Sequence, residues 1–310
     1  MSADKTAGPP SGAGLPAVNL AAKSRPGEAV VKALLLTAAV LSVAITFGIV
    51  IALLAPTLDF FREVPFGEFF SADDQKEFAV LPLVMGTLVT TVIALAVAVP
   101  IGLGAAMYLS EYASPRARKI LKPTVELLAG VPSVVYGFFA VYFVSEIFFQ
   151  KWFNWQSLGL LNALSAGLIL GVMVIPTIAS LAEDALSAVP QAMRQGSLAM
   201  GANRMQTTLR VVLPAALSGV MAAIVLGMSR AIGETMIVTI AAGTLKNLSF
   251  NPTESMQTMT SFMAIKAGGE DPVGTPGYNM LFAVGMLLFV ITLVVNFISI
   301  SIVRRYRQAY

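Results

Sequence analysis

The sequence predicts an all-α, polytopic membrane protein with six transmembrane helices. Hydrophobic residues make up 56% of the 310-residue chain and charged residues only 12%, about half of the ~25% charged residues of soluble proteins. The mean hydropathy is +0.79. The apolar residues fall into six runs, each long enough to supply the ~20 residues that cross a bilayer. A soluble protein of this composition would have too few charges to cover its surface.

The chain divides into a short polar start and a long membrane domain. Residues 1–29 are rich in Pro, Gly, Ala and Ser and have no apolar period, so we expect a disordered segment on the cytoplasmic side. The membrane domain, 30–310, has expected spans at about 30–56, 80–109, 123–149, 161–182, 214–242 and 279–303. Pro100, Pro132 and Pro176 lie inside three of these runs, and each is expected to kink or break its helix.

The basic residues predict the orientation. Six spans place both termini on one side, together with the connections 110–122 and 183–213. That side holds 14 of the 20 basic residues, namely Lys5, Lys23, Arg25, Lys32, Arg116, Arg118, Lys119, Lys122, Arg194, Arg204, Arg210, Arg304, Arg305 and Arg307. The other side holds 5, namely Arg62, Lys76, Lys151, Lys246 and Lys266. The excess predicts cytoplasmic termini. Contacts with lipid headgroups account for the basic clusters, so no nucleic-acid partner is expected.

The connection at 183–213 resembles a pair of helices more than a loop. It is amphipathic on both sides of Gly201, a residue that suits a left-handed turn between two helices. The expected apolar face consists of Leu198, Met205, Leu209 and Val212, and the residues expected to face water or headgroups are Arg194, Arg204 and Arg210. Two interpretations remain open. The pair docks in a groove of a soluble partner, or it is an ordinary interfacial helix pair.

The same connection resembles the coupling loop of ABC importer permeases. Gly201, followed after nine residues by Val211, Val212, Leu213 and Pro214, matches the second half of that pattern. Its first half, Glu-Ala-Ala, is replaced by Gln195, Gly196 and Ser197. Three further stretches, 126–137, 171–186 and 230–235, resemble the phosphate-specific (Pst) branch. The PstC subunit is the most similar, and its partner permease PstA is the close alternative.

The resemblance implies a type I ABC importer permease fold with a cytoplasmic coupling helix, in the bacterial inner membrane. The implied function is import of inorganic phosphate with a PstA-like permease, two copies of a PstB-like ATPase and a periplasmic PstS-like binding protein. The chain has no G-x-x-x-x-G-K-[ST] loop, so we expect no enzymatic activity, metal or cofactor of its own, and ATP bound by the partner. The implied coupling residues are Gly201, Ala202, Met205, Leu209, Leu213 and Pro214.

Other cargoes and another transporter class stay open. Molybdate, sulfate or phosphonate fits the same fold, because the external binding protein does most of the selecting in this class. A secondary transporter or channel without an ATPase would need ion-coupling carboxylates in several spans, and Glu234 is the clearest acid at membrane depth. A membrane enzyme fits less well, because the chain contains no cysteine, no histidine and no clustered carboxylates.

Two charges in the fifth span are the candidate site. Arg230 and Glu234 lie four residues apart, on one face of the expected helix, and the cost of charge at membrane depth predicts that both face the protein interior. One interpretation is a structural ion pair or interhelical hydrogen bonding. The other is a translocation path or gate, with Thr235, Ser133 and Thr177 as further hydroxyl donors. Glycines expected at close helix contacts are Gly86, Gly102, Gly104, Gly171, Gly219 and Gly227.

Overall fold

The computed structural model describes residues 26–269 and 271–305, and within these residues every regular element is helical. The chain forms two units, 1–49 and 50–310, which are described separately. The long helix α1 (Pro26–Glu63) belongs to the first unit as far as Ile49. Residues 27–49 are all exposed, as expected for an apolar helix whose side chains meet lipid. Residues 26–29, which were expected to be disordered, are therefore helical, and residues 1–25 lie outside the described part.

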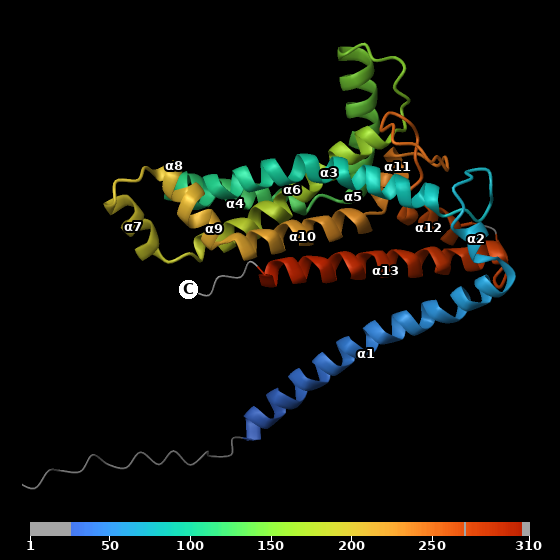
Figure 1. Ribbon diagram of the computed structural model, residues 1–310, viewed down its shortest axis with the longest axis horizontal. Helices are drawn as coiled ribbons and strands as arrows, with labels where there is room; N and C mark the ends of the chain where they lie inside the picture. Colours follow the sequence, from blue (N-terminus) through green and yellow to red (C-terminus); the bar gives the residue numbers. More distant parts are fainter. Residues whose placement is uncertain (1–25, 270, 306–310) are drawn as a thin grey trace, which may run out of the picture. The chain divides into compact units, whose positions relative to one another are not determined.

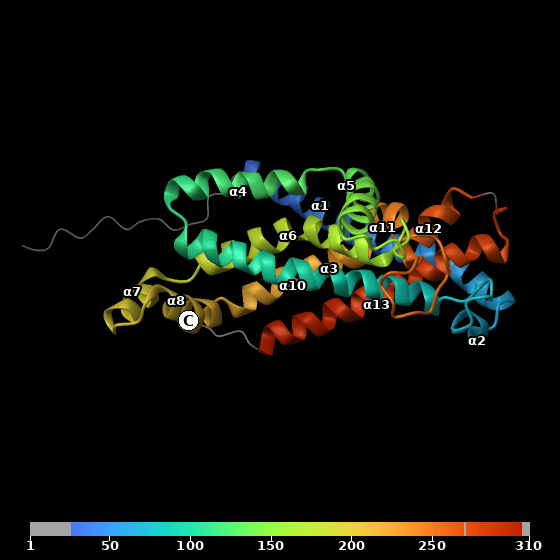
Figure 2. The same ribbon diagram turned by 90° about the horizontal axis from the view of Figure 1, so that it is seen from above.

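The second unit contains the remaining helices (Figures 1 and 2). Their order is α2 (Phe66–Phe69), α3 (Leu81–Met107) with its π-helical continuation η1 (Tyr108–Tyr112), α4 (Pro115–Ala129), α5 (Ser133–Phe139) with its π-helical continuation η2 (Ala140–Trp152), α6 (Ala163–Ser187), α7 (Gln191–Ala199), α8 (Arg204–Thr207), η3 (Thr208–Val212), α9 (Leu213–Ala215), α10 (Leu217–Gly233), α11 (Met236–Ala241), α12 (Met259–Ala267) and α13 (Pro276–Arg305).

The prediction of an all-α polytopic membrane protein is confirmed. Within the described residues five helices are long and apolar enough to cross a membrane: Gly27–Glu63, Leu81–Tyr112, Ser133–Trp152, Ala163–Ser187 and Pro276–Ser301. The pair Arg204–Ala215 and Leu217–Gly233, bent by 74°, makes a sixth if it is taken as one span. The bend falls at Ala216, whose side chain is buried.

The structure differs from the sequence prediction at the third and fifth runs. Instead of one helix over 123–149, α4 ends at Ala129 and a new helix begins at Ser133. Pro132 is the residue before that helix, since it lacks the N–H that a continuous helix needs there. The green segment η2 rises away from α3 and α6 in Figure 1 and is seen end-on in Figure 2. In the fifth run α10 ends at Gly233, and Glu234 is extended, with ψ at 132°.

Helix α6 is the central helix of the second unit. In its most apolar window 61% of the residues are buried, against at most 33% in the other candidate spans. Its cap Asn162 is fully buried, accepts the N–H of Ser165 at 2.7 Å and donates to the Ser145 hydroxyl at 3.1 Å. Small residues let α3 approach α6 closely, because a Cβ on Gly171 would lie 2.8 Å from the carbonyl oxygen of Ala94. Pro176 lies inside α6 without ending it.

Opposite ends of the second unit carry different features. Helices α7 and α8 lie at one end in both views, near the start of α4, while α11 and α12 lie toward the other (Figures 1 and 2). Between α11 and α12 the chain leaves the bundle and returns, held by backbone hydrogen bonds from Met256 to Ala242 and from Ala163 to Glu254. The sequence analysis did not anticipate α12, which lies between the fifth and sixth runs.

Candidate functional site

The turn between α7 and α8 has the geometry expected for Gly201. Its φ is +89°, a left-handed value that favours glycine. The N–H of Gly201 donates to the carbonyl of Leu198 at 3.0 Å, and the N–H of Ala202 donates to Ser197 at 3.2 Å. Asn203 and Gln206 then form a reciprocal capping box at the start of α8. The sequence analysis missed this box, although its residue types were visible.

Four large apolar side chains are exposed on this turn and the helices beside it. They are Leu198, Met200, Met205 and Leu209, and we call them the coupling patch; Met200 is 89% exposed. Exposed apolar side chains that gather on one turn are typical of a surface that binds another protein. Among the expected coupling residues, Leu213 packs against the core under the turn, while Pro214 is exposed. Val212, which was expected on the apolar face, is fully buried.

Arg194 corrects one prediction. It was expected to face water or lipid headgroups, but it is only 8% exposed. Its guanidinium contacts the carboxylate of Glu111, with Nη2 to Oε1 at 2.8 Å. Arg204 and Arg210 are exposed, as expected. Sequence periodicity missed the contact because Glu111 lies 83 residues away along the chain.

The polar residues near the end of α10 divide into two separate groups. Nη1 of Arg230 donates to the hydroxyl of Thr177 on α6 at 3.2 Å. Glu234 lies beyond the end of α10, and its Oε1 accepts the N–H of Met236 at 3.1 Å and of Ile237 at 3.4 Å. Among the described residues no carboxylate forms an ion pair with Arg230. The expected common face does not form, because the helix ends between the two charges.

The break between α10 and α11 is fixed by several hydrogen bonds. The hydroxyl of Thr260, on α12, donates to the carbonyl of Glu234 at 2.7 Å. The hydroxyl of Thr235 donates back to Gly233 at 3.3 Å. A cavity of about 440 Å³ lies beside the break, and its lining includes Gly233, Thr235 and Thr260 with apolar side chains of α12 and α13. The break is therefore a defined structure with a hollow next to it.

The exposure of the candidate residues differs from the expected enclosure. Arg230 is exposed in this single chain, and Glu234, Thr235 and Thr177 are half-buried. Ser133, the first residue of α5, is half-buried too, and no hydrogen bond joins it to the others within the described residues. The structure therefore joins Arg230 and Thr177 by a hydrogen bond and, among the described residues, gives Ser133 no hydrogen bond to either.

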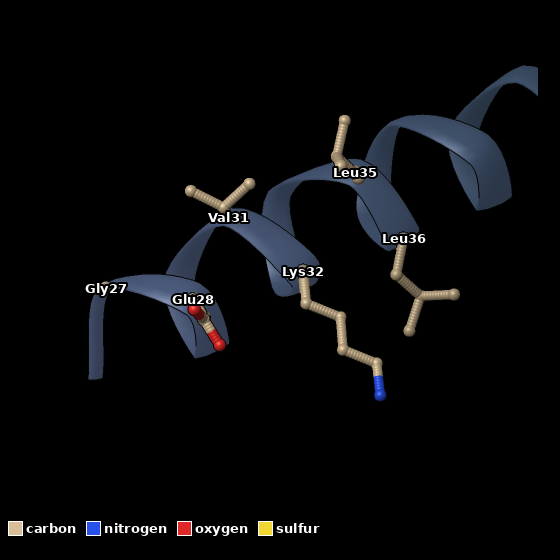
Figure 3. A pocket seen from close by; sticks show the side chains of 6 residues that line it. All are labelled: Gly27, Glu28, Val31, Lys32, Leu35 and Leu36. Atoms are coloured by element: carbon tan, nitrogen blue, oxygen red, sulfur yellow. The ribbon is translucent and has the colours of Figure 1, made fainter. Parts of the chain in front are cut away.

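A hollow along the first turns of α1 carries no comparable chemistry. It is lined by Gly27, Glu28, Val31, Lys32, Leu35 and Leu36. Figure 3 shows that these side chains come from one helix and point outward from it instead of converging. Among the described residues no group of three or more Asp or Glu side chains is placed to hold a metal ion.

Comparisons with known proteins agree on one class. Residues 98–308 match the family described as the inner membrane component of binding-protein-dependent transport systems. The probable ABC transporter permease YqgH of Bacillus subtilis is 35% identical over 233 residues, covering 75% of this chain and 72% of that protein. The phosphate transport system permease PstC 1 of Mycobacterium tuberculosis is 36% identical, covering 74% and 73%. The PstC permease of Haemophilus influenzae is 30% identical, covering 76% and 78%.

Solved structures share the fold. A bacterial ABC transporter that imports alginate aligns with a TM-score of 0.63 at 17% identity, over 92% of this chain and 100% of that one. The inward-facing MetNI methionine ABC transporter aligns with a TM-score of 0.55 at 18% identity, over 74% and 94%. At these identities the likeness concerns the arrangement of helices alone.

Proposed function

Because the chain belongs to the inner-membrane components of binding-protein-dependent transport systems, and among them to the PstC-type permeases, we propose that its cargo is inorganic phosphate. The chain is an ABC importer permease subunit. In the proposed arrangement it lies in the bacterial inner membrane with both termini in the cytoplasm, and transport is driven by ATP that a separate subunit binds. The support for phosphate is the set of PstC relatives together with the environment of Arg230.

The proposed partners follow from the same membership. A PstA-like permease pairs with this chain, two copies of a PstB-like ATPase dock below, and a PstS-like periplasmic protein delivers the anion. The coupling patch supports the position of the ATPase, because Met200 and Met205 are 89% and 63% exposed on a surface turn. Methionine side chains adapt to irregular apolar grooves. The left-handed turn at Gly201 fixes the angle at which α7 and α8 meet such a groove.

Arg230 carries the proposal for the translocation path. One of its nitrogens is bound to Thr177, and a guanidinium has five N–H donors, so others remain for an anion. A charge at membrane depth costs roughly 2.5–3.5 kcal/mol on insertion scales, and this cost disfavours contact between an exposed Arg230 and lipid. We therefore infer that this face is covered by the partner permease or by water in the path. Glu234 and Thr235 shape the break beside it, and Ser133 remains a proposed member.

Reconstitution tests the proposed function directly. The chain is co-purified with the candidate partner permease and ATPase, placed in vesicles with the binding protein, and supplied with labelled phosphate. We expect uptake that requires ATP and is not displaced by excess sulfate, molybdate or phosphonate. Preferred uptake of one of those anions would reassign the cargo within the same fold. Uptake without the ATPase would contradict the importer mechanism and favour a secondary transporter.

A further inference from the structure

The end of α6 is held by a buried arginine from the next helix. Arg194, on α7, donates through Nη2 to the carbonyl of Leu186 at 2.8 Å and through Nη1 to the carbonyl of Val189. These carbonyls lie at the end of α6, where helices leave acceptors without intrahelical partners. Through Nε and Nη2 the same guanidinium binds Glu111 of η1, at 2.8–3.3 Å. Arg194 therefore joins α7 to both α6 and the end of α3.

A second charged group lies one turn earlier on α6. The side chain of Glu183 is fully buried, and its carboxylate binds Arg118 and Lys122 of α4, the latter at 2.5 Å. Lys122 also binds Asp184 at 3.0 Å, and Ser187 donates to Glu183 at 3.2 Å. The charges of the two carboxylates, Glu183 and Asp184, balance those of the two cations, Arg118 and Lys122. Together with Arg194 they fix the end of α6 to three neighbouring elements.

Helix α6 also carries Thr177, the partner of Arg230. Thr177 precedes Glu183 by six residues, which is about 9 Å along a helix. The helix is continuous from Thr177 to Ser187. Pro176 lies directly before this stretch and removes one backbone hydrogen bond of the preceding turn. A bend at Pro176 would therefore fall N-terminal to Thr177 and outside the stretch 177–187. The stretch 177–187, which we call the arm of α6, is thus an unbroken helix. It connects α7, which we call the coupling helix, with the region of Arg230.

We propose that Arg194 is a positioning residue that locks the coupling helix α7 to this arm of α6, while Glu183 holds the same end of α6 to α4. The proposal rests on the proposed function, since it assigns a route for force within that importer. When the ATPase moves α7, the arm moves with it, and the contact between Thr177 and Arg230 changes. Without the lock, α7 moves while the arm keeps its position. ATP hydrolysis then no longer changes the conformation of the translocation path.

Two measurements on the assembled complex test the lock. The first is the ratio of phosphate imported to ATP hydrolysed, in Arg194→Ala and Arg194→Lys. We expect Arg194→Ala to lower this ratio about tenfold, within the usual range of allosteric coupling, while ATP hydrolysis continues. Arg194→Lys should recover part of it, because an ammonium can pair with Glu111 but lacks the planar fork that reaches both carbonyls. Arg116→Ala is the control, since Arg116 is exposed and is the second residue of α4.

The second measurement does not depend on the cargo. The chain has no cysteine, so Gln191→Cys, at an exposed position of α7 outside the coupling patch, and Leu181→Cys on α6 give a spin-label pair across the lock. We expect one narrow distance distribution in the wild-type background with and without ATP. Arg194→Ala should give a broader distribution that changes with ATP. An unchanged distribution in Arg194→Ala, or an unchanged uptake-to-ATP ratio in folded complexes of either Arg194 variant, would overturn the proposal. If wild-type complexes import no phosphate, the proposed function fails, and the distances still decide the lock.

Discussion

Gly171 of α6 lies directly against the backbone of Ala94 in α3. A Cβ added at Gly171 would be 2.8 Å from the Ala94 carbonyl oxygen and 3.2 Å from its Cα. Backbone atoms cannot rotate away as a flexible side chain does, so relief requires the two helices to separate. The close contact between α3 and α6 therefore depends on the absence of one methyl group.

Gly171→Ala should destabilise the protein by about 1–3 kcal/mol, the usual effect of overpacking. Gly104→Ala is the matched control, because a Cβ on Gly104 meets nothing within 4 Å. The midpoint of thermal unfolding, measured on the purified chain, compares the stability of the two variants. The sequence analysis grouped the two glycines as close helix contacts, and the structure supports this for Gly171 only. Equal midpoints for the two variants would contradict the packing argument.

Asn162→Ala should be more damaging than the loss of an ordinary helix cap. The substitution removes the cap on α6, so the backbone N–H of Ser165 loses its acceptor and the buried Ser145 hydroxyl loses its amide donor. Together these effects should cost about 2–4 kcal/mol. Asn203→Ala removes an exposed cap on α8 and should cost about 1 kcal/mol. Denaturation of the two variants under identical conditions compares them, and a larger loss at Asn203 would refute the ranking.

Gly201→Val should preserve membrane abundance but reduce transport. The φ of +89° is strained for a β-branched residue, although a Cβ at Gly201 meets no atom within 4 Å. The effect should therefore come from the turn itself and not from a clash. Gly196→Val, in the helical part of α7 and equally free of neighbours, should transport normally. Wild-type uptake by Gly201→Val would show that the turn does not transmit force.

The charge swap Arg230→Glu with Glu234→Arg should not restore transport. The two residues do not pair, and Glu234 instead accepts two N–H groups at the start of α11. Arg230→Gln alone should abolish uptake and leave the protein folded, since Arg230 is exposed in this chain. Glu234→Gln keeps an acceptor oxygen and should also stay folded. Uptake assays with parallel measurement of abundance decide this, and recovery in the swap would restore the interpretation as a structural ion pair.

Glu254 makes the segment between α11 and α12 sensitive to acid. Hydrogen bonds from Asn247 first, then from Asn251 and Ser249, lower the pKa of its carboxyl below the ordinary 4.5. A lowered folded-state pKa contributes stability above the ordinary pKa and loses it as pH falls through the lowered value. The thermal midpoint of the wild type should therefore exceed that of Glu254→Gln near neutral pH, and this small difference should be lost as the pH falls through the lowered pKa of Glu254. Glu63→Gln, at an exposed position, is the control variant.

The apolar helices could be predicted well from the sequence, because the length and hydropathy of each run are enough to identify a membrane span. Span length and hydropathy are local quantities, so the helical membrane class follows without tertiary information. The breaks were harder to place. Pro132 signals a break somewhere in its run, but the end of α10 at Gly233 is stabilised by Thr260, from a different helix. No local pattern reports that contact.

The candidate site was predicted in part for the same reason. Arg230 and Thr177 were chosen from residue type and depth, and they do meet. The assumed i, i+4 relation of Arg230 and Glu234 required a continuous helix, which the structure lacks. Arg194 was assigned to the surface because most arginines in amphipathic helices are solvated. Its burial depends on Glu111 and on two carbonyls of α6, all brought near only by the fold.

Arg118, Lys122 and Arg194 have one role during membrane insertion and another in the folded protein. During insertion their tertiary partners are not yet in place, so all three count as positive charges that retain their segments on the cytoplasmic side in the proposed orientation. After folding, each binds a carboxylate on another element. The charge excess that orients the nascent chain is therefore larger than the excess that the mature surface presents to an ATPase.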